Sequence, residues 1–98
     1  MKKKIMIKMW QKCLFKTKIN TFNCEYILVK SEADNGSKYI TYGIKINKCD
    51  RYGNLLETKK VQDIGADKDK VIQIIKLLKD FKVTPVTLED VIMDRINI

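Results

Sequence analysis

The chain has 98 residues, of which 45% are apolar and 33% charged, with four glycines and one proline. This length fits a single domain, residues 1–98, with one modest core and little room for a deep pocket. The formal net charge is +8, and residues 1–20 hold seven lysines and no acidic residue. Such a segment attracts anionic partners through its long-range field, although a solvated strand is the simpler explanation.

Alternating side chains predict a first strand from Ile5 to Phe15. A helix is the alternative, because some of the apolar residues are also four positions apart, but the β-rich segments that follow favour a strand. One face of this strand is apolar. The other face mixes lysines with large apolar side chains: Lys4, Met6, Lys8, Trp10, Lys12, Leu14 and Lys16.

Three further strands are predicted, at residues 21–31, 39–48 and 55–62, because β-branched and aromatic residues dominate the first two and turn residues separate all three. Asp34-Asn35-Gly36 favours a tight hairpin, and Gly53 marks a second loop at residues 50–54. The last strand is the most polar and is expected at a sheet edge, where lysines discourage unwanted pairing.

The hydrophobic period then changes to that of a helix, predicted over residues 68–81 with Asp67 as its N-cap. Its apolar arc covers roughly 220°, which is wider than a single contact with a sheet requires. A second segment should therefore cover its flank. Val83-Thr84-Pro85 should end the helix, and Thr87 is the expected cap of a short second helix at residues 88–96.

These elements predict an α+β fold: a four-stranded antiparallel β-meander with a C-terminal helix packed on one face and a second short terminal helix. A single layer of helices covers one face of a sheet. The other face should be open and should carry some of Met6, Trp10, Tyr26 and Tyr39. An open apolar sheet face often marks a binding surface.

Several short motifs in the second half of the chain resemble an uncharacterised family of small clostridial (Firmicute) proteins. The resemblance spans residues 39–95 and leaves out the lysine-rich first strand. Because that family has no established activity, the resemblance implies no mechanism. The motifs are Tyr42-Gly43-Ile44, Val61-x-Asp63-Ile64, the helix from Asp67, Val83-x-Pro85-x-x-Leu88 and Asp90-Val91 followed by Asp94.

No catalytic, cofactor or metal site is expected. The three cysteines form no Cys-x-x-Cys pair and the chain has no histidine, so a disulfide framework, a zinc site and a His-activated thiol are not predicted. Cys13 and Cys24 fall on strand faces rich in apolar residues and are expected to be small buried side chains. Asp90 and Asp94 lie one helical turn apart, but two carboxylates are too few for a hard cation. They are predicted to form a solvated face or an acidic docking face. No glycine-rich phosphate loop is present.

The sequence therefore favours a non-enzymatic, cytoplasmic protein with reduced thiols and no membrane segment. The leading hypothesis is a regulatory or interaction module that binds an unidentified protein partner or a second copy of itself. The alternative is nucleic-acid binding, in which lysines contact phosphates and Trp10 stacks on a base. The candidate binding surface is Lys4, Lys8, Trp10, Lys12, Lys16 and Tyr39.

Overall fold

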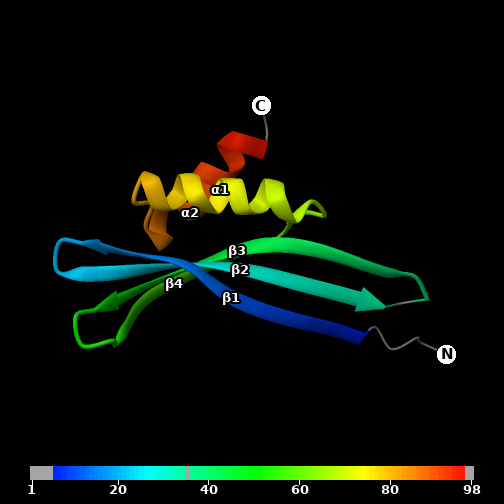
Figure 1. The fold of residues 1–98 in the computed structure, drawn as a ribbon, viewed down its shortest axis with the longest axis horizontal. Helices are drawn as coiled ribbons and strands as arrows, with labels where there is room; N and C mark the ends of the chain where they lie inside the picture. Colours follow the sequence, from blue (N-terminus) through cyan, green and yellow to red (C-terminus); the bar gives the residue numbers. More distant parts are fainter. Residues whose placement is uncertain (1–5, 35, 97–98) are drawn as a thin grey trace.

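The computed structural model describes residues 6–34 and 36–96, which form one antiparallel sheet with two helices on one side (Figure 1). The elements are β1 (Met6–Ile19), β2 (Phe22–Asp34), β3 (Lys38–Asp50), β4 (Leu55–Gly65), α1 (Lys68–Asp80) and α2 (Pro85–Ile96). The sheet order is β1-β2-β3-β4, so each strand pairs with the next along the chain. The predicted α+β meander is confirmed, and the polar last strand lies at an edge.

Tight turns keep the strands in this order. β1 continues four residues beyond its predicted end, because Asn20 adopts a φ of 54° and turns the chain directly into β2. In the hairpin predicted at Asp34-Asn35-Gly36, Gly36 has a φ of 105°, and Asn35 lies outside the described residues. The β3–β4 turn is held by Asp50, whose carboxylate accepts hydrogen bonds from the backbone N–H groups of Tyr52 and Asn54, each at 2.9 Å.

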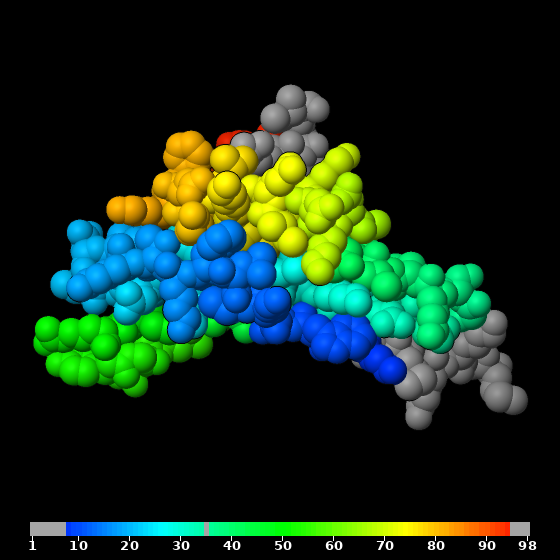
Figure 2. Space-filling model, viewed as in Figure 1, coloured from blue at the N-terminus to red at the C-terminus, as the bar shows by residue number. Residues whose placement is uncertain are grey.

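The helices cover only the middle of the sheet. A 13-residue helix such as α1 spans about 20 Å, whereas a 13-residue strand such as β2 spans about 43 Å. Both ends of the sheet therefore extend beyond the helical layer, as Figure 2 shows, and the molecule measures 52 × 33 × 19 Å. The core between the layers contains Cys24, Tyr26, Leu28, Ile44, Ile46, Val71, Ile75, Leu78, Leu88 and Ile92.

Tyr26 belongs to this core and not to the open face on which the sequence placed it. Its side chain is fully buried beneath the helices. Its hydroxyl donates a hydrogen bond to the carbonyl of Val83, at 2.9 Å. The phenol thus ties β2 to the connection between α1 and α2.

The start of α1 follows the prediction. The Asp67 carboxylate accepts hydrogen bonds from the backbone N–H groups of Asp69 and Lys70, at 3.0 and 3.3 Å, as an N-cap does. The helix ends one residue earlier than predicted. Lys82 takes a φ of 52° and Val83 donates its N–H to the carbonyl of Leu78 at 2.9 Å, which is the geometry of a Schellman motif.

The start of α2 differs from the prediction. The helix begins at Pro85 and not after Thr87, because a proline is well suited to the first position of a helix, where its missing N–H costs nothing. Thr87 lies inside the first turn, where its hydroxyl donates to the carbonyl of Thr84 at 3.4 Å. Neither helix in the described part of the chain is long and apolar enough to cross a membrane.

Candidate functional site

A β-bulge in β1 divides the lysine-rich surface that the sequence predicts. The ladder between β1 and β2 skips one residue, Leu14. An extra residue in one strand reverses the side-chain alternation beyond it. Lys8, Trp10 and Lys12 therefore point to the helix side of the sheet, and Lys16 points to the helix-free side. The expectation that these four side chains share one face is wrong for Lys16.

The remaining members of the predicted surface also lie apart from Trp10. Lys16 is 3.7 Å from the carboxylate of Glu25. Tyr39 pairs with Ala33 on the helix-free face and is 54% exposed. Lys4 lies outside the described residues. The candidate surface is thus spread over both faces, and Trp10 is not on the open face.

On the helix side, Trp10 borders a hollow of about 370 Å³, here called the Trp10 hollow. Sequence reasoning did not assign Lys30, Tyr42 and Lys68 to this place, because only the strand register and the position of α1 bring them together. The Lys30 ammonium lies 5.0 Å from the centre of the Trp10 ring. The hollow is lined by Trp10, Gln11, Lys12, Leu28, Lys30, Tyr42 and Lys68.

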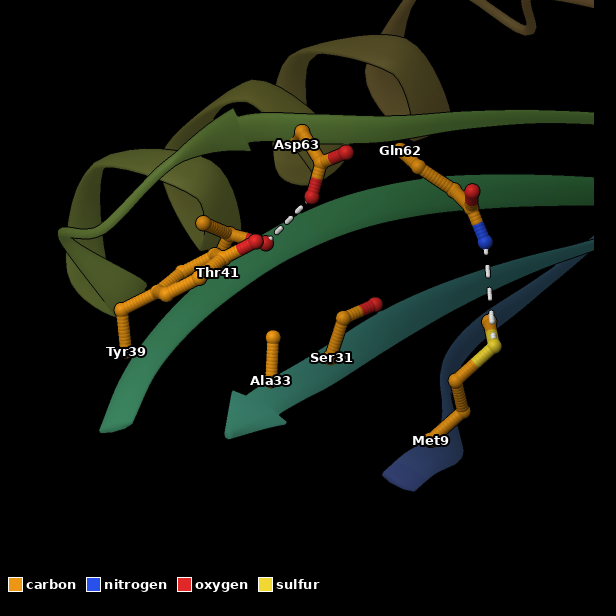
Figure 3. Close-up of a pocket in the computed structure, with 7 residues that line it drawn as sticks. All are labelled: Met9, Ser31, Ala33, Tyr39, Thr41, Gln62 and Asp63. Carbon is orange, nitrogen blue, oxygen red and sulfur yellow. Dashed lines mark hydrogen bonds between the residues drawn. The ribbon is translucent and has the colours of Figure 1, made fainter. Parts of the chain in front are cut away.

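A second hollow, of about 170 Å³, lies on the helix-free face and is called the sheet hollow (Figure 3). Asp63 accepts a hydrogen bond from the Thr41 hydroxyl at 2.5 Å, and the Gln62 amide donates to the sulfur of Met9 at 3.7 Å. A side chain of edge strand β4 therefore reaches a side chain of edge strand β1 across this face. The lining residues are Met9, Ser31, Ala33, Tyr39, Thr41, Gln62 and Asp63.

Gly43 is the residue that lets β4 approach so closely. A Cβ atom at this position would lie 2.4 Å from the carbonyl oxygen of Val61. Beyond this contact β4 is bulged, and Asp63 takes a φ of 55°. The bend brings Gln62 toward β1, and Val29, which faces this side, is fully buried. The helix-free face is thus partly closed by the sheet's own edges.

The sheet hollow has limited chemical capability. Small-molecule pockets usually measure about 300 Å³ or more, and this hollow is smaller. Its one carboxylate, Asp63, already accepts a hydrogen bond from Thr41. Within residues 6–34 and 36–96, no group of three or more histidine, cysteine, aspartate or glutamate side chains could hold a metal ion. The arrangement suits recognition by shape and hydrogen bonding.

The predicted acidic pair lies on α2, away from both hollows. Asp90 and Asp94 are both exposed, and docking of a basic partner on them stays a prediction. The neighbouring Glu89 is 3.2 Å from the ammonium of Lys59 on β4. This ion pair links α2 to the sheet edge.

The pKa of each of the three cysteine thiols is raised. Burial raises the pKa of Cys24, which lies in the core as predicted. Cys13 was also expected to be buried, but the structure exposes it on the helix-free face; the pKa of its thiol is raised by partial burial and then by the Glu25 carboxylate. The pKa of Cys49 is raised by the same two causes. A raised pKa disfavours the reactive thiolate.

Comparison with protein families identifies the class of the chain. A family of unknown function, DUF6514, matches residues 4–97. The chain belongs to this family, and the match includes the lysine-rich strand that the resemblance had left out. The clostridial range implied by the resemblance stays a prediction. No curated protein and no solved structure matches the chain.

Proposed function

We propose that this protein is a small, non-enzymatic interaction module that binds a protein partner through the helix-free face of its sheet. The observation that carries the proposal is that α1 and α2 cover one face only (Figure 1). On the other face, Met9 and Tyr39 remain 40% and 54% exposed beside the sheet hollow. Partly exposed apolar side chains around a depression are typical of recognition surfaces.

The outer edge of β1 offers a second way of binding. β1 lies at the end of the sheet order, so its outward backbone groups can pair with an added strand. Two copies pairing antiparallel around Lys12 would place Lys12 opposite its own copy, and like charges in direct opposition destabilise a pair. An acidic extended segment therefore suits this edge better than a second copy does.

The absence of catalysis is part of the proposal. Its support is the raised pKa of the thiols and the lack of a metal-ligating cluster in the described part of the chain. A catalytic site usually gathers a nucleophile or acid–base pair with a group that stabilises charge. We also place the protein in the cytoplasm, where its three thiols stay reduced.

Light scattering combined with affinity capture from a cell lysate tests the proposal. We expect either a defined oligomer or a retained protein. A monomer at all concentrations that retains nothing would count against a binding module.

Nucleic-acid binding is the second candidate function. It is favoured by the seven lysines without an acidic residue in residues 1–20. Binding should then weaken steeply with salt, because each neutralised phosphate releases a counterion. A titration with labelled oligonucleotides at low salt tests it, and an unchanged anisotropy would exclude it.

A further inference from the structure

The Trp10 hollow combines aromatic and cationic side chains in a regular way. Trp10 on β1 pairs with Lys30 on β2, and Lys30 pairs with Tyr42 on β3. Cross-strand partners share a face, so these three side chains form one row on the helix side. Adjacent strands are about 4.8 Å apart, which places the Trp10 and Tyr42 backbones about 10 Å apart. Two aromatic side chains thus border the hollow, and Lys30 lies between them in the row.

Apolar and basic groups line the other sides of the hollow. Leu28, which is 6% exposed, lies on the same face one step along β2 and belongs to the core. Lys68, the first residue of α1, lines the opposite wall. Figure 2 shows the start of α1, in yellow-green, above the blue first part of β1. The volume of about 370 Å³ lies at the lower end of the range for small-ligand pockets.

The charge in the hollow is of one sign. Lys12, Lys30 and Lys68 line it, and no carboxylate does. Among the described residues, no ion pair engages any of these three ammonium groups. Two acidic residues near the hollow have other partners: Glu32 forms an ion pair with a β3 lysine at 3.9 Å, and the Asp67 carboxylate caps α1. The hollow therefore favours a ligand that carries several negative charges.

We propose that the Trp10 hollow binds one nucleotide unit of a single-stranded nucleic acid. The base stacks on Trp10, and Lys12, Lys30 and Lys68 hold the adjoining phosphates. Stacking on an aromatic side chain combined with phosphate contacts is how sequence-tolerant single-strand binding works. This proposal rests on the second candidate function and assigns it a site.

The concave shape favours a single strand over a duplex. A base can enter a hollow between a sheet and a helix only when it is free of its neighbours, whereas duplex bases stay paired and stacked. A duplex would reach the lysines through its phosphates and leave Trp10 untouched. An acidic peptide would supply charge without a base to stack on Trp10. Both the duplex and the acidic peptide should therefore leave the indole fluorescence nearly unchanged, whereas a stacked base should change it.

Trp10 is the only tryptophan of the chain, so its fluorescence reports directly on the hollow. The experiment titrates the full chain at low salt with a short, labelled oligothymidylate. Probe anisotropy measures binding anywhere on the protein, and Trp10 emission measures stacking in the hollow. We expect both signals to change with one midpoint. Duplex DNA and polyglutamate should leave Trp10 emission nearly unchanged.

Variants separate stacking from charge. Trp10→Ala should weaken binding about tenfold, and the 47% exposure of this side chain makes a folded variant the expected result, to be verified by circular dichroism. Lys30→Gln and Lys68→Gln should each lower the salt slope by about 0.7. Lys60→Gln removes the same charge from the helix-free face of β4, and it should leave affinity and quenching unchanged.

Three results would overturn the assignment. No anisotropy change at low salt would exclude both the site and the nucleic-acid function. An anisotropy change without a change in Trp10 emission would place binding elsewhere and leave that function standing. Equal quenching by polyglutamate would show that the hollow binds anionic ligands in general and does not require a base.

Discussion

Replacing Gly43 with alanine tests the contact that shapes the sheet hollow. The new Cβ would lie 2.4 Å from the Val61 carbonyl oxygen and 2.9 Å from the Gln62 Cα, and both are backbone atoms. An ordinary contact needs about 3.4 Å, so β4 must move by about 1 Å. That shift loosens the hydrogen bond between Thr41 and Asp63. Overpacking of this kind costs about 3 kcal/mol, which lowers the melting temperature of a domain this size by about 12–24 °C.

Gly65→Ala is the matched control. It lies on the same strand, and a Cβ there would meet no atom within 4 Å. Its stability should stay within about 0.5 kcal/mol of the parent protein. Thermal and urea unfolding followed by circular dichroism measure both variants. If Gly43→Ala unfolds at the same midpoint as Gly65→Ala, the close approach of β4 over Gly43 is wrong.

Three further changes test other parts of the fold. Tyr26→Phe leaves the Val83 carbonyl without its buried donor and should cost about 1–3 kcal/mol in urea unfolding; an unchanged midpoint would contradict the link. Leu88→Ala opens a cavity under α2 and should lower the free energy of unfolding by about 2–5 kcal/mol. The control Val86→Ala changes an exposed side chain of the same helix and should cost under about 0.5 kcal/mol. Equal losses in the two variants would refute the packing of Leu88 between α2 and the sheet. Hydrogen bonds in the β3–β4 turn, led by those from Asn54, lower the pKa of Asp50. The stabilisation that the ionised Asp50 carboxylate gives the folded state is therefore complete above its unfolded-state pKa and is lost as pH falls through its folded-state pKa. The difference in unfolding free energy between the parent protein and Asp50→Asn should therefore shrink on acidification, and a difference that stays constant with pH would contradict this.

The regular parts of the fold could be predicted because local signals agree there. Asp67 caps α1 as expected, and the polar last strand lies at the edge. At α2 a proline at the first helical position is a stronger start signal than the threonine two residues later, so the helix begins earlier than predicted. β1 is longer than predicted because the chain turns only at Asn20, which has a φ of 54°.

The candidate surface was harder to predict because strand alternation is a local signal and the bulge is not. The alternation of lysines continues to Lys16, but the face changes at Leu14. A signal was present: Leu14 and Phe15 are consecutive apolar residues that both pack on the core, and Ile19 continues in phase with Phe15. Two adjacent buried residues within an alternating strand indicate a bulge.

Trp10, Lys12 and Tyr39 were candidates from the sequence, but the residues that join them in the two hollows could not be read from it. Tyr42 joins Trp10 only through the register of three strands, and Lys68 does so only through the placement of α1. Gln62 reaches β1 because β4 bends over Gly43. Such contacts depend on tertiary geometry, for which residue patterns give no direct signal.

If the helix-free face binds a protein partner, substituting Tyr39, near the start of β3, and Tyr52, in the turn that follows β3, should have different effects on binding. Tyr39→Asp places a charge beside the sheet hollow, whereas Tyr52→Asp alters the 75% exposed side chain at the distant turn. In light scattering and affinity capture, we expect the parent protein and Tyr52→Asp to keep the same partner or oligomer and Tyr39→Asp to lose it. Retention by both variants, with both folded, would show that the partner does not bind at the helix-free face.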